Sequence, residues 1–271
     1  MRKRITSKNN PVLKECIRLS QKKYRDREGK YLIEGENLIR EAVLSGVTPE
    51  TILICEGSRF EREMPDGVPP DPDTEICLLP PELFRKAADT VTSQGILGVV
   101  RKRSDAREQI LEANSPESRY VVLDRLQDPG NIGTIIRTAE AAGFSCVIFV
   151  RGTGDPFAPK VVRAAAGALF RVPMLFVEDT EDLIAFVRKL GKRLVVTCLD
   201  DAVPYEEAGL GAGDAIVIGN EGNGCDRELI RQADLRITIP MQGKIESLNA
   251  SVAAGILLYE TCRAGNHRKQ R

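Results

Sequence analysis

The sequence predicts an α/β protein in two parts, a small α/β domain followed by a mostly parallel sheet with helices on both faces. Three observations support this fold class. Short β-branched apolar runs alternate with segments of helical spacing along most of the chain. The runs of the second half are apolar throughout, which is typical of strands buried on both faces. A charged stretch at 101–118, containing Ser, Asn and Pro, interrupts the alternation and indicates a boundary.

We therefore expect a first domain at 1–104, a linker at 105–117 and a second domain at 118–271. The first domain begins with apolar residues at helical spacing over 10–19, and an acidic, proline-rich loop interrupts it at 56–75. Its other expected elements are strands at 31–34, 51–55, 76–79 and 96–100 and helices at 37–45 and 81–88.

In the second domain, Gly143 and Gly191 follow helical segments in the position of C-terminal caps. The expected strands are 120–124, 145–150, 193–198, 215–219 and 235–239, with an extended run at 172–177. The expected helices are 131–142, 155–168, 181–190, 226–233 and 247–262. In the last of these, Ser247 stands where a helix is capped, and the small residues after it allow close approach of another backbone.

The composition narrows the class of protein. With 271 residues, 42% hydrophobic and 29% charged, the chain has globular values. It has no bilayer-length apolar run and no secretory signal, so we expect a cytoplasmic protein without membrane contact. The seven cysteines form no CxxC pair, and the one histidine is His267 in a charged tail. We therefore expect free thiols, no metal and no Ser-His-Asp triad.

The charge is unevenly distributed although the net charge is zero. Residues 1–30 contain eleven Lys and Arg against three Asp and Glu, whereas 50–82 contain two against nine. A basic segment on a neutral protein suggests a polyanionic partner, with a merely solvated surface as the alternative. An aromatic ring among cations can stack on a base while the cations bind phosphates. The candidate RNA-binding residues, expected in a loop, are Lys22, Lys23, Tyr24, Arg25 and Arg27.

The strand-to-helix corner near the C-terminus collects polar residues. Pro240 ends a strand, Gly243 lets the loop turn, and Glu246, Ser247 and Asn249 precede the helix. Corners at the carboxyl ends of strands in open α/β sheets are where ligands usually bind. A capped helix that packs into a core is the alternative interpretation.

Three stretches together carry a family resemblance: VVLDRLQDPGNIGTIIRTAEAAG at 121–143, AIVIGNEGNGC at 215–225, and IPMQGKIESLN before the last helix. In this order and spacing they resemble the three motifs of the SpoU/TrmH family of RNA ribose 2′-O-methyltransferases, in the SPOUT superfamily. The resemblance covers about residues 118–263. REGKYLIEGENLIREA resembles the substrate-binding domain that precedes many such catalytic domains.

The resemblance implies S-adenosylmethionine as cofactor, a deep trefoil knot, and a homodimer formed through the C-terminal domain and its last helix. One departure is Ala165, where the family often has serine. The implied catalytic residues are Asn131, Arg137, Glu221, Ser247 and Asn249. The implied cofactor-binding residues are Thr197, Cys198, Gly219, Ile239 and Leu248.

The role of Arg137 has two interpretations. A general base would require a neutral guanidinium, which costs about 9 kcal/mol near neutral pH. A cationic Arg137 that binds RNA phosphate and stabilises developing alkoxide charge is the less costly role.

The expected function is methyl transfer from S-adenosylmethionine to a ribose 2′-hydroxyl of structured RNA, with ribosomal RNA favoured over tRNA by the basic N-terminal segment. The alternatives are a tRNA ribose methyltransferase, a SPOUT enzyme that methylates a base, and a non-catalytic RNA-binding protein on the same fold.

Overall fold

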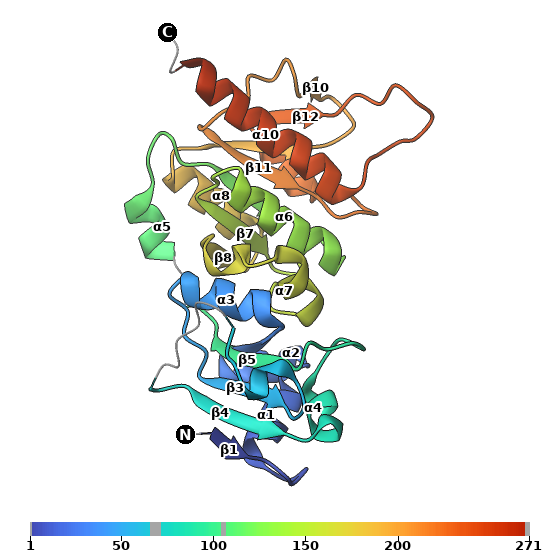
Figure 1. Cartoon of the computed structure of the whole chain (residues 1–271). Helices are drawn as coiled ribbons and strands as arrows, with labels where there is room; N and C mark the ends of the chain where they lie inside the picture. Colours follow the sequence, from blue (N-terminus) through green and yellow to red (C-terminus); the bar gives the residue numbers. More distant parts are fainter. Residues whose placement is uncertain (1, 66–71, 104–106, 269–271) are drawn as a thin grey trace. The chain divides into compact units, whose positions relative to one another are not determined.

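The computed structural model describes residues 2–65, 72–103 and 107–268 and divides into two compact units (Figure 1). The first unit contains Met1–Arg103 and also Asp155–Arg171, and the second contains Ser104–Gly154 and Val172–Arg271. The division at 1–104, 105–117 and 118–271 stays a prediction. The compact units add that a segment from the second half of the sequence packs within the first unit. Parts of the predicted loop and linker, at 66–71 and 105–106, lie outside the described residues.

A mixed sheet forms the centre of the first unit, in the strand order β1-β4-β3-β5-β2. β1, β4 and β3 are parallel, whereas β5 runs antiparallel to both β3 and β2. The strands are β1 (Arg2–Arg4), β2 (Lys30–Glu34), β3 (Thr51–Cys55), β4 (Glu75–Leu79) and β5 (Ile96–Arg101). The helices are α1 (Pro11–Arg18), α2 (Lys22–Glu28), α3 (Glu36–Leu44), α4 (Pro81–Ala87) and α7 (Pro159–Ala165), with short 3-10 turns at Arg59–Glu61 and Ala168–Phe170.

Two expectations for this unit were wrong. The cationic stretch expected as a loop is helix α2, which Gly29 ends in the left-handed conformation at φ +63°. The helix expected at 155–168 is shorter: α7 has Pro159 in its first turn and stops where Ala166 adopts φ +48°. Strand β1 was not predicted, because its three residues are all exposed and carry no apolar pattern.

The second unit is built on a sheet in the order β10-β12-β9-β11-β6-β7-β8, in which every neighbouring pair is parallel. This confirms the predicted fold class. Its strands are β6 (Tyr120–Leu123), β7 (Cys146–Val150), β8 (Met174–Val177), β9 (Arg193–Thr197), β10 (Val203–Pro204), β11 (Asp214–Ile218) and β12 (Leu235–Thr238). Its helices are α5 (Arg107–Ala113), α6 (Pro129–Ala141), α8 (Thr180–Lys189), α9 (Arg227–Gln232) and α10 (Ala250–Arg268).

Helices cover both faces of this parallel sheet. Alternate strand residues such as Val122, Ile148 and Val196 join one buried cluster with residues of α5, α8 and α9. On the other side α6 and α10 pack side by side, and they contact β7 and β11 respectively (Figure 1). The strands are therefore buried on both sides, which explains why their sequences are apolar throughout. Among the described helices, none combines the length and apolar character that crossing a membrane requires.

The strand order brings distant motifs together at the carboxyl ends of neighbouring strands in this sheet. β12, β9, β11 and β6 are consecutive neighbours, so their carboxyl ends lie together. The register places Thr197 opposite Ile237 and Leu123 opposite Ile218. The loops that follow these four strands contain the three motifs named above.

Candidate active site

A hydrogen-bonded cluster joins one residue from each motif. The Asn131 side-chain amide donates to Glu221 Oε1 over 3.1 Å, and the Asn249 amide donates to Asn131 Oδ1 over 2.9 Å. Asn131 is only 7% exposed, and its side-chain nitrogen and oxygen each have a hydrogen-bond partner within the protein, as buried polar groups require. Three of the five predicted catalytic residues are therefore in direct contact, although 118 positions separate Asn131 and Asn249.

The Glu221 carboxylate also binds the start of helix α6. The backbone N–H groups of Gln127 and Asp128 each donate to it over 3.3 Å. Partial burial raises the pKa of the Glu221 carboxyl, but the hydrogen bonds from Asn131 and the backbone lower it by more, so its pKa lies below the ordinary value. Glu221 is accordingly ionised near neutral pH. The stability that it contributes is complete above its unfolded-state pKa and is lost as the pH falls through the lower folded-state value.

Sequence reasoning missed Asp128 and Asn220 as supports of this cluster. Asp128 caps α6, because its Oδ1 accepts from the Asn131 N–H over 2.8 Å. The Asn220 amide donates to the Arg125 carbonyl over 2.8 Å. The signal for Asp128 was in the sequence, since an Asp directly before a Pro at the first helical position is a helix-start pattern.

Gly219 is required by the protein's own backbone. A Cβ at this position would lie 2.4 Å from the Cys225 nitrogen and 2.5 Å from the Gly224 carbonyl carbon. The loop folds back in this way because Asn220 and Gly224 exchange two backbone hydrogen bonds of 3.0 Å each. The absent side chain thus makes room for residues 224 and 225.

The other candidate cofactor residues lie at the same sheet edge. Thr197 ends β9 and donates from Oγ1 to the Val217 carbonyl over 3.0 Å, while the Cys198 N–H donates to the Ile237 carbonyl. Ile239 follows β12, and Leu248 directly precedes the Asn249 of the cluster. All four side chains are half-buried; Thr197, Cys198 and Ile239 lie at the strand ends, and Leu248 lies in the loop before α10. Such a lining fits the nucleoside and thioether parts of S-adenosylmethionine.

Ser247 and Arg137 lie outside the hydrogen-bonded cluster. Helix α10 begins at Ala250, and Asn249 caps it by accepting from the Ser251 N–H over 3.0 Å, so the prediction that Ser247 begins and caps this helix was wrong. Ser247 is exposed in the preceding loop. Arg137 is exposed on α6, about 9 Å along the helix axis from Asn131 by helical rise. Within residues 2–65, 72–103 and 107–268 its guanidinium has no hydrogen-bond or ion-pair partner.

The candidate RNA-binding residues of α2 divide into two groups. Lys22, Lys23 and Arg27 are exposed, with Arg27 bonded to Glu28 over 2.6 Å. The Tyr24 ring is already covered by guanidinium groups, because the Arg27 and Arg18 Cζ atoms lie 5.0 and 5.7 Å from its centroid. A base that stacks on Tyr24 would have to displace one of them.

Arg25 is a correction to the predicted RNA-binding set. It is 3% exposed and forms an ion pair of 2.7 Å with Asp155, and it also donates to the carbonyls of Leu19 and Ser20. Its guanidinium is therefore engaged inside the protein and is withdrawn from solvent.

Within the described ranges, the cysteines form neither a disulfide nor part of a metal site. All seven cysteines fall within the described ranges and are free thiols. Burial raises the pKa of the Cys225 thiol, beside Thr197, to about 12, which keeps it neutral. In the described part of the chain, no group of three or more His, Cys, Asp or Glu side chains is arranged to hold a metal ion.

Comparison with known proteins identifies the family. Residues 118–259 match the model of the SpoU rRNA methylase family, and residues 10–98 match that of the MRM3-like substrate binding domain. The chain belongs to the SpoU rRNA methylase family, as the three motifs had predicted. It is thus a methyltransferase, and the predicted enzyme class is confirmed.

Individual relatives match along most of the chain. The 23S rRNA (guanosine(2553)-2′-O)-methyltransferase RlmP of Bacillus subtilis is 34% identical over 95% of this chain and 98% of its own. The mitochondrial rRNA methyltransferase 3 of Mus musculus is 31% identical over 88% of this chain and 68% of its own. The AdoMet-bound rRNA methyltransferase from Sinorhizobium meliloti is 32% identical and superimposes with a TM-score of 0.84, covering 97% of this chain and 98% of that one. These matches support the predicted cofactor, S-adenosylmethionine.

We predict that Gly219→Ala destabilises the protein by about 1 to 3 kcal/mol, because the added methyl group overlaps backbone atoms that cannot move independently. Urea denaturation measures this as a lower midpoint. Gly222→Ala in the same loop is the matched control, since its Cβ would meet its nearest neighbour at 3.7 Å. Equal midpoints for the two variants would contradict the close approach seen at Gly219.

Proposed function

We propose that this methyltransferase transfers the methyl group of S-adenosylmethionine to a ribose 2′-hydroxyl of structured RNA, with ribosomal RNA as the substrate. The observation that carries the proposal is the contact among Asn131, Glu221 and Asn249, one residue from each motif, at the edge where the strands end. The relatives named as rRNA 2′-O-methyltransferases support the acceptor and the RNA class. A non-catalytic RNA-binding protein would not need this cluster.

The cofactor supplies an electrophilic methyl group, and the chain's residues have to hold it and guide the hydroxyl. We assign its apolar contacts to the half-buried side chains of Thr197, Cys198 and Ile239, at the strand ends, and of Leu248, in the loop before α10. Gly219 acts indirectly, by allowing the loop 220–224 to fold beside them. Glu221 fixes the start of α6 against this loop, so that the two motifs keep one geometry in which the reacting atoms can align.

We assign the phosphate-binding and charge-stabilising role to Arg137. It projects into solvent from α6, the helix whose first turn contains Asn131, and it is unpaired within the described ranges. A free guanidinium is available for an RNA phosphate beside the reacting ribose, where it stabilises the developing negative charge. Ser247, exposed in the loop before α10, is placed to hydrogen-bond the substrate.

We predict that Arg137→Ala lowers the methyl-transfer rate about 100-fold or more, because one charged group that acts on the transition state is lost. Isothermal titration should give an unchanged affinity for S-adenosylmethionine. Arg188→Ala, which removes an exposed arginine from α8 of the same unit, is the control and should retain the wild-type rate. Wild-type turnover by Arg137→Ala would remove this residue from the mechanism.

The chemical position of the methyl group tests the proposed function directly. Unmodified ribosomal RNA is incubated with the protein and methyl-labelled S-adenosylmethionine, digested to nucleosides and separated by mass spectrometry. We expect the label in a 2′-O-methylnucleoside. Label in a methylated base would support the base-methylating alternative, and no label with retained RNA binding would support the non-catalytic one. A parallel reaction with tRNA distinguishes the two RNA classes.

We propose a homodimer formed through α10. Val252 and Tyr259 are 51% and 55% exposed, and with Ile256 they form one apolar stripe, opposite the buried Leu257 and Leu258. Between them Gly255 leaves open space where its Cβ would be, so a second backbone can approach closely.

We predict that light scattering after size exclusion gives twice the chain mass at micromolar concentration. Tyr259→Lys, which places a charge in the stripe, should shift the protein toward the monomer. A wild-type monomer would overturn the dimer.

We also propose a trefoil knot in the C-terminal fold, on the basis of the family resemblance, and a cytoplasmic location, on the basis of the free cysteines.

A further inference from the structure

The ion pair between Arg25 and Asp155 is the most deeply buried one in the described parts of the chain. The two side chains are 4% and 8% exposed, and Arg25 Nε and one terminal nitrogen both contact Asp155 Oδ2, at 2.8 and 2.7 Å. The other terminal nitrogen donates to the Leu19 and Ser20 carbonyls. Asp155 Oδ1 accepts from the Phe157 N–H over 2.9 Å. Both side chains are therefore hydrogen-bonded on several atoms, and removing either would leave the other a buried charge without a counter-charge.

Arg25 lies on the helix that carries the proposed RNA-binding cations. Its neighbours Lys22, Lys23 and Arg27 are exposed, while Arg25 itself points inward. The ion pair thus joins helix α2 to Asp155, and both belong to the first unit. It fixes which face of α2 points inward.

The residues that directly precede Asp155 are bonded to the first motif, within the second unit. The Gly154 N–H donates to the Leu126 carbonyl over 2.8 Å, and Thr153 Oγ1 accepts from the Arg125 N–H over 3.0 Å. The Gln127 amide donates to the Gly152 carbonyl over 2.5 Å. A Cβ on Gly154 would lie 2.7 Å from the Ile132 side chain, so this stretch also packs tightly against α6.

We propose that Arg25 and Asp155 are positioning residues for methyl transfer. The chain from Gly152 to Asp155 is bonded at one end to the loop 125–128, whose amides hold Glu221, and at the other end to helix α2. A peptide bond, Gly154 to Asp155, joins the two sets of contacts. The ion pair therefore fixes one end of this short segment, and the other end fixes the loop that binds Glu221. This inference rests on the proposed function.

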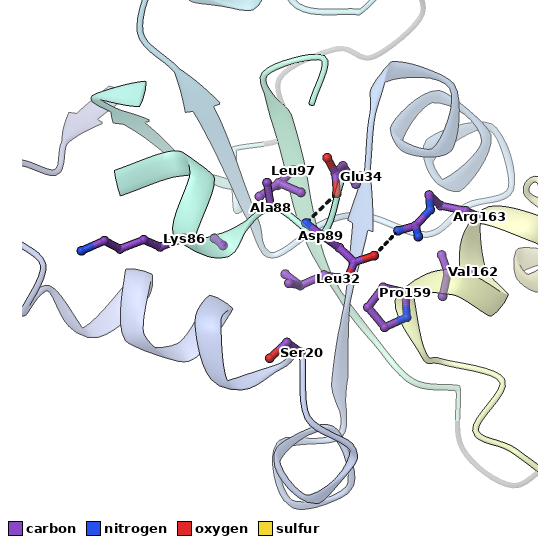
Figure 2. Close-up of a pocket in the computed structure, with 11 residues that line it drawn as sticks. Ser20, Leu32, Glu34, Lys86, Ala88, Asp89, Leu97, Pro159, Val162 and Arg163 are labelled. Carbon is purple, nitrogen blue, oxygen red and sulfur yellow. Dashed lines mark hydrogen bonds and ion pairs between the residues drawn. The ribbon is translucent and has the colours of Figure 1, made fainter. Parts of the chain in front are cut away.

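A second ion pair of the segment Asp155–Arg171 is much more exposed. Figure 2 shows Asp89 between Glu34 and Arg163: the Asp89 N–H donates to Glu34, and its carboxylate forms a 2.5 Å ion pair with Arg163. These side chains line a pocket with an apolar wall that includes Leu32 and Val162. The Asp89 and Arg163 side chains are 40% and 33% exposed, so solvent screens their charges. The Asp89–Arg163 pair is therefore a suitable control for the buried pair.

The test compares Asp155→Asn, the double variant Arg25→Met with Asp155→Asn, and the control Asp89→Asn, each in the full chain. The asparagine that replaces Asp155 keeps an acceptor for the Phe157 N–H, and the double variant leaves no buried charge. The double variant therefore keeps the test decisive if Asp155→Asn alone fails to fold. The probe is an unmodified 23S rRNA transcript with labelled S-adenosylmethionine, and the readouts are the single-turnover rate at saturation, both dissociation constants and thermal unfolding.

We expect the single-turnover rate at saturating RNA to fall tenfold or more in Asp155→Asn and in the double variant, with the dissociation constant for S-adenosylmethionine within twofold of wild type. Asp89→Asn should match wild type throughout. A purely structural role would let the double variant recover the rate together with its stability, and that result would overturn the proposal, as would weaker RNA binding with a wild-type rate at saturation. A wild-type enzyme that transfers no methyl group to any RNA would instead overturn the proposed function.

Discussion

The second unit depends on one constraint, the binding of the Glu221 carboxylate by groups from another motif. Glu221 follows β11, and it accepts from the Asn131 amide and from two backbone N–H groups at the start of α6. A carboxylate that accepts from several donors on another segment holds that segment in a fixed geometry, since each lost bond leaves a polar group without its partner. The strand order makes this contact possible, because β11 and β6 are neighbours with aligned carboxyl ends.

The same bonding extends in two directions. Through Asn131 it reaches Asn249, which also caps α10, so the helix that carries the apolar stripe begins at the cluster. Through the loop 125–128 it reaches Gly152 and Gly154. The candidate site is thus supported by hydrogen bonds between residues that are far apart in the sequence and meet only in the folded chain.

Much of the fold and of the site could be predicted from sequence, for physical reasons. Apolar runs that alternate with segments of helical spacing predicted the parallel strands, and the motifs predicted that Asn131, Glu221 and Asn249 act together. Arg25 could not be predicted, because its partner is 130 residues away and nothing in KKYRDRE distinguishes a buried arginine from an exposed one. The cap of α10 was misplaced by two residues, since Ser247 and Asn249 have almost equal preference for that position.

The segment Asp155–Arg171 comes from the second half of the sequence but packs within the first unit. It therefore limits how independently the two halves can evolve. Phe157 packs against Tyr31 at 4.9 Å between ring centroids, and Val162 and Phe170 are almost fully buried within the first unit. A catalytic half inherited without its N-terminal partner would carry these apolar side chains uncovered, and would be prone to aggregation. Loss or replacement of the N-terminal domain therefore requires matching substitutions in a segment encoded more than fifty positions away, so that the two halves of the gene are expected to change together.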